Sequence, residues 1–189
     1  MNDSPSPFAI DADTLTGEMK PIRRAVVALG SNLGDRESNL QGAVGQLADT
    51  PDVWITGVSP VYETIPVDSP EGSGDYLNAV VLLDTTLPAK VLMDRALAIE
   101  EAFDRTRTEG VINEPRTIDV DLITVGDKVS DEPHLQLPHP RAAQRAFVLK
   151  PWFDLEPDAE IPGIGLVAEL LQAADATGLT LTDITLVVD

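Results

Sequence analysis

The sequence predicts an α+β domain of the ferredoxin-like (βαββαβ) kind, a mainly antiparallel sheet with helices packed on it, followed by C-terminal additions. Three observations predict it. Apolar runs of strand length alternate with stretches of helix length in the order strand, helix, strand, strand, helix, strand. The chain has 189 residues, the size of one domain. Its residues are 43% hydrophobic and 24% charged, which is typical of a globular protein.

The composition also limits the organisation and the class of protein. Residues 1–22 are rich in Pro, Ser and Asp without periodicity, so we expect a flexible leader and a single domain over residues 23–189. The chain has no cysteine, which excludes a thiolate metal site. It has no membrane-spanning apolar run, so we expect a cytoplasmic protein without a membrane partner. A formal charge of −19 argues against nucleic-acid binding, which depends on Lys and Arg neutralising phosphates.

The first predicted strand and helix are joined by a glycine turn. Residues 24–29 form an apolar run that we expect to be buried on both faces of a sheet. Residues 30–35 follow with two glycines, and Asp35 is placed to cap the next helix. That helix carries its apolar residues on one face: Leu40, Val44 and Leu47.

The next two predicted strands flank a long loop. Residues 53–62 read as the second strand and the strongly apolar residues 79–86 as the third. The loop between them, residues 63–74, is rich in Pro, Gly and Ser. A loop of this length in a compact domain is typically functional or disordered.

A second helix leads into the last strand of the pattern. Pro88 occupies the first position expected of a helix that runs to about residue 104. Residues 105–114 then precede a strand over residues 115–123. The remaining expected elements are a turn at 126–129, a short helix at 147–155 broken by Pro151, a helix at 166–174 and an edge strand at 179–188.

The strand at 115–123 carries the clearest chemical signal. Side chains in a strand alternate, so Asp119 and Asp121 point the same way while the apolar residues around them point into a core. Two neighbouring carboxylates repel each other unless a cation lies between them. Mg²⁺ binds one or two protein carboxylates and takes its other oxygens from water and phosphates. The pattern predicts a magnesium site; the alternative is a solvated strand face in an Asp-rich chain.

The arginines gather around this pair. Five of the nine arginines fall between residues 105 and 145. Arg116 lies just ahead of the aspartate pair and offers a planar donor that matches a phosphate. In an acidic chain this placement indicates a site for an anion together with a metal, against the alternative of scattered surface salt bridges.

Five short motifs occur in a characteristic order: 30–36 (GSNLGDR), 75–79 (DYLNA), 105–107 (RTR), 115–121 (PRTIDVD) and 138–141 (PHPR). Together, over roughly residues 24–165, they resemble the hydroxymethyl-dihydropterin pyrophosphokinase family of folate biosynthesis. The resemblance implies a ferredoxin-like fold. It also implies an ATP-dependent diphosphotransferase that moves pyrophosphate from ATP to the hydroxymethyl group of 6-hydroxymethyl-7,8-dihydropterin, giving AMP.

The resemblance further implies roles for individual residues. Two Mg²⁺ ions would be held by Asp119 and Asp121, which form the catalytic set with Arg105 and Arg116. The implied ATP-binding residues are Glu100, Arg105, Arg107, Arg116, Leu122, Leu135, His139 and Arg145. The implied pterin-binding residues are Thr64, Pro66, Val67, Tyr76, Asn78 and Phe147. The partners are then small molecules; we expect a monomer and leave association with neighbouring folate enzymes open.

Each of these assignments has a plainer alternative. Tyr76 and Phe147 suit stacking against a flat ring, but aromatic residues also pack in cores. His139 alone reads as an ordinary loop histidine, and Glu100 near a helix end as a solvated carboxylate.

One stretch departs from the family pattern. Relatives carry an Arg-Trp-Gly-Pro-Arg run before the D-x-D strand, whereas this chain has Val111-Ile112-Asn113-Glu114-Pro115-Arg116. The resemblance makes this stretch part of a loop that closes over the substrates and excludes water. We expect an altered lid over residues 108–114, with weaker sealing or a slower chemical step.

Three other functions compete with the active pyrophosphokinase. A ferredoxin-like binding module could keep affinity for pterin or nucleotide without turnover. A D-x-D hydrolase or glycosyl transferase would keep the metal but gives no role to Tyr76, Asn78 and His139. An RNA-binding module is disfavoured by the net charge and by the lack of an aromatic-basic strand.

Overall fold

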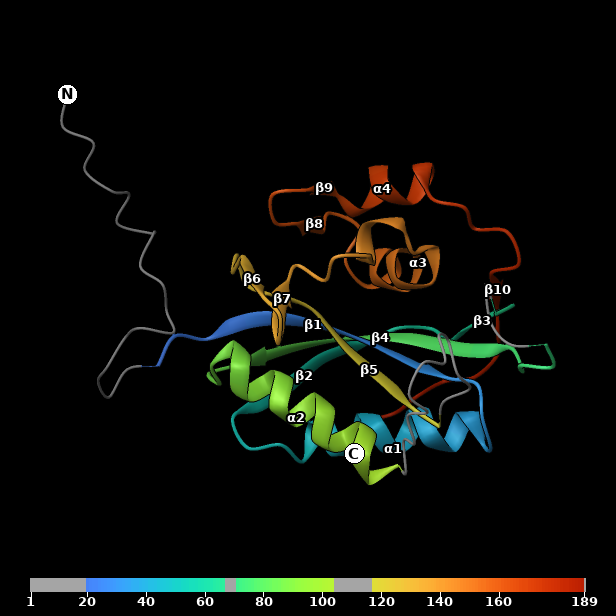
Figure 1. The fold of residues 1–189 in the computed structure, drawn as a ribbon, viewed down its shortest axis with the longest axis horizontal. Coiled ribbons are helices and arrows are strands. Elements are labelled where there is room, and N and C mark those ends of the chain that lie inside the picture. Colours follow the sequence, from blue (N-terminus) through green and yellow to red (C-terminus); the bar gives the residue numbers. More distant parts are fainter. Residues whose placement is uncertain (1–19, 67–70, 104–116, 189) are drawn as a thin grey trace.

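The computed structural model describes residues 20–66, 71–103 and 117–188. In these residues a central sheet is covered by helices on both faces (Figure 1). Helices α1 (Arg36–Ala48) and α2 (Ala89–Ala102) lie on one face. Helices α3 (Ala146–Leu155) and α4 (Val167–Ala173) lie on the other.

The sheet is antiparallel at every pairing that the structure describes. Strand β1 (Arg23–Ser31) lies at its centre, between β4 (Tyr76–Thr85) and β5 (Asp119–Val125). Both remaining strands of this part of the chain, β2 (Val53–Val58) and β3 (Tyr62–Thr64), pair with β4. A two-residue strand, β10 (Thr180–Leu181), extends the edge at β3. The expectation of a mainly antiparallel sheet with packed helices is confirmed.

The face under α1 and α2 is a continuous apolar core. Alternate residues of β1, β4 and β5 point into it, and they meet the buried side of each helix. Helix α1 begins where Asp35 caps it: the carboxylate accepts the backbone N–H of Ser38 at 3.1 Å, as predicted. The apolar face expected for this helix is buried and comprises Leu40, Ala43, Val44 and Leu47.

The opposite face is covered by the chain that follows the strands β6 (Ser130–Glu132) and β7 (Leu135–Leu137). These two strands form a hairpin, and Leu135 and Leu137 belong to the core under α1 and α2. A 3-10 turn η2 (Ala142–Gln144) then leads into α3. A second small hairpin, β8 (Glu160–Ile161) and β9 (Gly165–Leu166), precedes α4. Trp152 and Leu149 of α3 are fully buried against Val80 and Ile123 of the sheet.

Several expected boundaries differ from the structure: the strand expected over 115–123 is β5 at Asp119–Val125, and the strand expected over 79–86 is β4 at Tyr76–Thr85. Three further differences have a physical cause. The strand predicted over 53–62 is two strands, because Pro60 has no N–H to donate to a ladder. The helix predicted to break at Pro151 runs through it, since its neighbours Leu149 and Trp152 are held in the core. The predicted edge strand 179–188 pairs over only two residues, after which the chain leaves β3 and packs Leu186 into the core below.

None of the helices within the described residues is long and apolar enough to cross a membrane.

Candidate active site

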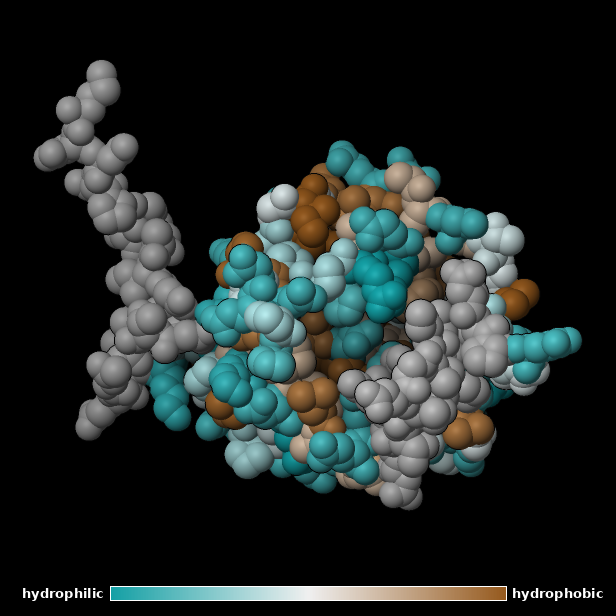
Figure 2. Space-filling view, in the orientation of Figure 1, coloured by the Kyte–Doolittle hydropathy of each residue, from teal (hydrophilic) through white to brown (hydrophobic). Residues whose placement is uncertain are grey.

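A cavity of about 480 Å³ opens on the α3 side of the sheet. Its floor is formed by β1 and β5, and its walls by the start of β4, the residues after β3, the start of α3 and the stretch 175–179. Figure 2 shows that the face of the molecule turned to the viewer is largely hydrophilic, with hydrophobic patches between polar groups. The cavity brings together residues from both halves of the sequence.

One end of the cavity holds the two predicted aspartates. Asp119 and Asp121 line it from β5, whereas Val120 and Leu122 between and after them are buried on the opposite face. Their partners across β1 are Gly30 and Ala28, which are small and leave the carboxylates reachable. The alternation predicted from the sequence is confirmed.

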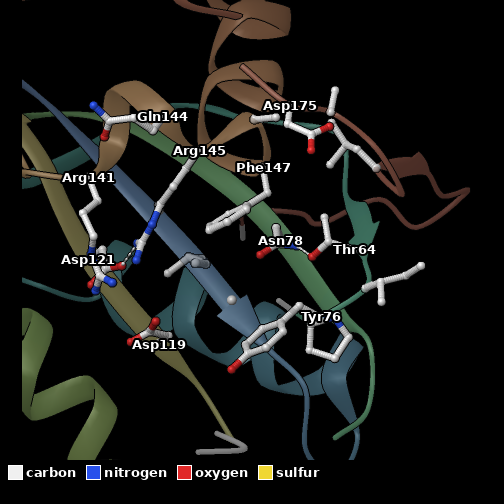
Figure 3. Close-up of a pocket in the computed structure, with 18 of the residues that line it drawn as sticks. Thr64, Tyr76, Asn78, Asp119, Asp121, Arg141, Gln144, Arg145, Phe147 and Asp175 are labelled. Atoms are coloured by element: carbon white, nitrogen blue, oxygen red, sulfur yellow. Dashed lines mark hydrogen bonds and ion pairs between the residues drawn. The ribbon is translucent and has the colours of Figure 1, made fainter. Parts of the chain in front are cut away.

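Cationic side chains face these carboxylates from the chain around η2 and α3. Arg145 approaches Asp121, with Nη1 at 3.6 Å from Oδ2, and its guanidinium lies 5.4 Å from the centre of the Phe147 ring. Arg141 lines the same end (Figure 3). Arginine forks bind phosphate oxygens well, so this end of the cavity can hold a polyanion.

His139 is neutral at physiological pH. Burial, with help from the nearby Arg145 and Arg141 charges, lowers the pKa of its imidazole to about 4. Its Nδ1 accepts the backbone N–H of Arg141 at 3.2 Å, so the ring proton sits on Nε2. Nε2 lies 4.0 Å from Oδ2 of Asp121. The ring therefore offers the cavity an uncharged N–H donor.

The other end of the cavity is suited to a flat polar ring. Tyr76 and Phe147 lie on either side of it, and Asn78 and Thr64 lie between them and the cavity wall (Figure 3). The Asn78 amide donates through Nδ2 to Thr64 Oγ1 at 2.9 Å. Its Oδ1 lies 3.5 Å from the place of a Cβ on Gly30, so an amide oxygen faces the floor.

The donor set fits a hard divalent cation. Asp119 and Asp121 supply two carboxylates on one strand face beside open space, and Mg²⁺ takes its remaining oxygens from water and phosphate. A protein cage of three or more acidic, His or Cys ligands is not found among the described residues. Any Mg²⁺ held here would share its coordination with a bound polyphosphate.

Nine of the predicted site residues line the cavity: Thr64, Pro66, Tyr76, Asn78, Asp119, Asp121, His139, Arg145 and Phe147. Four others lie outside the described residues: Val67, Arg105, Arg107 and Arg116.

Three predicted ATP-binding residues lie away from the cavity. Glu100 is only 3% exposed, and its Oε1 accepts the backbone N–H of Val120 at 2.9 Å, so it supports β5 from behind. The alternative of a solvated Glu100 is wrong for the same reason. Leu122 and Leu135 bury their side chains in the core under α2. A contact between either leucine and a ligand would have to come from its backbone.

Several cavity residues were missed at the sequence level. Arg141 ends the Pro-His-Pro-Arg motif and is one of the five arginines between residues 105 and 145, which was the available signal for it. Gln144 ends η2, and no sequence signal indicated it. The stretch Asp175, Ala176, Thr177 and Leu179 also lines the cavity. No local pattern indicates that this stretch folds back over the residues following β3.

Comparison with known proteins identifies a family and relatives that this chain resembles. The family described as 7,8-dihydro-6-hydroxymethylpterin-pyrophosphokinase (HPPK) matches residues 26–157. A 2-amino-4-hydroxy-6-hydroxymethyldihydropteridine pyrophosphokinase of Pseudomonas aeruginosa is 36% identical over 84% of this chain and 96% of its own. The protein of that name from Methylorubrum extorquens is 40% identical, over 84% of this chain and 98% of its own.

Solved structures agree on the fold. The crystal structure of wild-type Plasmodium falciparum HPPK-DHPS with STZ-DHP superposes with a TM-score of 0.60 at 16% identity. The match covers 83% of this chain and 44% of that chain, so the present chain spans less than half of the solved one.

Proposed function

This chain belongs to the 7,8-dihydro-6-hydroxymethylpterin-pyrophosphokinase family, and we propose that its cavity is the site of that reaction. The enzyme transfers pyrophosphate from ATP to the hydroxymethyl group of 6-hydroxymethyl-7,8-dihydropterin, giving AMP, in folate biosynthesis. The substrate hydroxyl oxygen bonds to the β-phosphorus of ATP while the bond between that phosphorus and the α-phosphate oxygen breaks.

The register of the sheet carries this proposal. Gly30 is paired with Asn78 on one side and with Asp119 on the other. The Asn78 amide, which can hydrogen-bond to a ring edge, and the Asp119 carboxylate, which can hold a phosphate-bound cation, therefore lie two strand spacings apart, roughly 10 Å. This is about the reach of a bicyclic ring with a one-carbon arm. The ring can be held at one end while its hydroxyl meets the phosphates at the other.

We assign the polyphosphate to the end that holds Arg141, Arg145 and His139. The two guanidinium groups and the imidazole N–H are donors, and pyrophosphate transfer asks for charge neutralisation and in-line placement more than for covalent chemistry. The cation–π contact with Phe147 fixes the Arg145 guanidinium beside the ring site. The Arg145 guanidinium is thereby held between the proposed polyphosphate end and the proposed ring site.

Two Mg²⁺ ions at Asp119 and Asp121 are part of the proposal. When bound, the metal neutralises charge on the phosphates and orients them. The two carboxylates line the cavity next to arginines that suit phosphates. Carboxylates at a phosphate site need a cation between them and the phosphates, which supports their role as metal ligands. Arg105, Arg107 and Arg116 are proposed phosphate ligands on the strength of the family motif, and Glu100, Leu122 and Leu135 are proposed to support the nucleotide site indirectly.

The strand order supports the finer fold assignment. With β2, β4, β1 and β5 side by side and antiparallel, and with a helix after β1 and after β4, the sheet has the order of a ferredoxin-like domain. We propose this class for residues 23–189 as one domain, with 1–22 as a leader. We also propose a monomer working in the cytoplasm, where ATP is available. The solved HPPK-DHPS chain supports association of this activity with a neighbouring enzyme in some systems.

The altered stretch 108–114 is proposed to weaken closure over the substrates. Restoring Arg-Trp at Ile112 and Asn113 should raise the rate of AMP formation. An unchanged rate in that variant would mean that the missing residues do not limit the reaction.

Formation of AMP from ATP and the hydroxymethyl pterin, with and without Mg²⁺, tests the function directly. We expect AMP only when both pterin and Mg²⁺ are present. Pterin binding without AMP would instead support a binding module that has lost turnover, and absence of both would reject the proposal.

A further inference from the structure

We infer that Asp175 determines specificity for the pterin: its carboxylate accepts hydrogen bonds from the amino edge of the ring. This inference rests on the proposed function and deepens it. Asp175 lies beyond residues 26–157, which the family pattern covers, yet it lines the same cavity as Asn78 and Thr64.

The chain places Asp175 through a tight turn after α4. The Asp175 Oδ1 accepts the backbone N–H of Thr177 at 2.9 Å, and the N–H of Leu179 donates to the Ala176 carbonyl at 3.1 Å. Gly178 has a φ of +78°, and a Cβ there would lie 3.3 Å from Ile65 Cδ1. Glycine therefore lets the turn close directly on the residue that follows Thr64.

The segment after the turn is fastened to the domain at three points. Strand β10 pairs with β3, so residues 180–181 lie beside Tyr62 and Glu63. Thr182 then donates to the Val61 carbonyl from both N and Oγ1, at 3.0 and 2.8 Å. Gln41 and the backbone of Val187 exchange two hydrogen bonds, at 2.8 and 3.0 Å. The turn that carries Asp175 is thus a fixed wall of the cavity.

The orientation of the substrate follows from the reaction. The hydroxymethyl arm at ring position 6 must point to the phosphates beside Asp119 and Asp121. The pyrimidine edge, with its 2-amino group and N3–H, is at the far end of the bicyclic ring. Figure 3 shows Asp175 on the side of Thr64 and Asn78, away from Asp121 and Arg141. The edge rich in N–H donors therefore faces Asp175.

The groups at that end complement those donors. Asn78 uses its amide N–H on Thr64, so its Oδ1 is the atom it presents as an acceptor. A carboxylate has about four lone-pair sites, and Thr177 uses only part of this capacity. The bonds from Thr177 lower the pKa of Asp175, so it is ionised at neutral pH. Two acceptors, one charged, face a ring edge with two kinds of N–H.

The test uses the full chain and three variants. Asp175→Asn keeps an oxygen for the Thr177 N–H but removes the charge, and Asp175→Ala removes both. The matched control is Asp183→Asn, because Asp183 is an exposed aspartate of the same segment and does not line the cavity. Pterin affinity is measured by calorimetry with a non-hydrolysable ATP analogue and Mg²⁺. The measurement is repeated with a pterin analogue that has hydrogen in place of the 2-amino group.

Asp175→Asn should weaken pterin binding roughly tenfold, as expected for loss of a hydrogen bond to a charged group. It should leave the KM for ATP and the kcat within about twofold, while Asp183→Asn changes none of these. The loss of affinity that the wild type suffers with the analogue should shrink in Asp175→Asn, because the variant no longer distinguishes the amino group.

The inference would be overturned if wild type and Asp175→Asn lost the same affinity when the analogue without the 2-amino group replaces the pterin. It would also be overturned if Asp175→Asn bound the pterin as tightly as wild type. An equal loss of pterin affinity in Asp183→Asn would mean that the charge of the segment, and not a contact with the ring, determines binding. That result would also overturn the inference. The calorimetry needs no turnover. A wild type that binds pterin but forms no AMP would therefore contradict the proposed function while still testing Asp175.

Discussion

The two faces of the sheet are built from the same strands and differ in what covers them. Under α1 and α2 the side chains of β1, β4 and β5 meet two helices along their length and form a closed core. Under α3 and α4 the coverage stops at Ile123 and Ala28, and beyond them the strands carry Asp121, Asp119 and Gly30 into a cavity. One strand thus carries apolar residues that pack in the core on one side and carboxylates that line the cavity on the other.

The contrast between the two faces shows how a small α+β domain accommodates charged groups. Two carboxylates buried in the α1–α2 core would have to be neutralised or paired. On the open face, Asp121 has Arg145 and His139 beside it and lines a cavity in which we propose that a cation and phosphates bind. Glu100 is the exception on the closed face, and it is held by the N–H of Val120.

The largest expected effect is on the open face of β5. Asp119→Ala or Asp121→Ala should reduce AMP formation by on the order of a thousandfold, since each removes a carboxylate that would hold the Mg²⁺ proposed to neutralise the transferring group. The melting temperature should change little, because both side chains are partly exposed. Asp131→Ala, an exposed aspartate of β6, is the matched control. Activity retained in either cavity variant would break the assignment of this face to catalysis.

Leu122, which follows Asp121 and points to the closed face, should affect stability and not catalysis. Leu122→Ala removes a side chain that is 1% exposed and should lower the free energy of unfolding by about 2–5 kcal/mol. The KM for ATP of the folded enzyme should stay within a few-fold. Urea unfolding and steady-state kinetics check both, with Leu97→Ala, at 43% exposure on α2, as the control. A stable Leu122→Ala with weak ATP binding would place that side chain in the nucleotide site.

Gly30 forms part of the cavity floor on the open face of β1. A Cβ there would make ordinary contacts of 3.5–3.9 Å with Asn78, Tyr76 and Asp119. Gly30→Ala should therefore be mild, whereas the larger side chain of Gly30→Val should fill the space of the ring and weaken pterin binding roughly tenfold or more. Titration of pterin against the two variants separates them. Equal affinity for wild type and Gly30→Val would mean that the ring does not lie over the floor.

The smallest effect is expected at the contact between β3 and α3, away from the cavity. The Tyr62 hydroxyl donates to Asp154 of α3 at 2.5 Å, and Lys150 also contacts that carboxylate. Tyr62→Phe should lower the free energy of unfolding by about 1 kcal/mol, because Lys150 still pairs with Asp154. The kinetics of AMP formation should stay within twofold, as Tyr62 does not line the cavity. A large kinetic change with unchanged stability would contradict this division between cover and cavity.

The sequence predicts well what depends on local pattern. The alternation around Asp119 and Asp121 comes from the two-residue period of a strand, and the Asp35 cap from a contact three residues along the chain. What it could not predict depends on tertiary contact. Glu100 looks like an exposed helix-end residue until β5 is placed behind it. Asp175 looks like part of a loop until Gly178 closes the turn on Ile65.

Pyrophosphate transfer itself is tested most directly with ATP labelled at the β-phosphorus. The enzyme, Mg²⁺ and hydroxymethyl pterin are incubated with this nucleotide and the products are separated. We expect label in the pterin product and unlabelled AMP, because the bond broken lies between the α- and β-phosphates. Label recovered in ADP, or in free pyrophosphate without a labelled pterin, would contradict it.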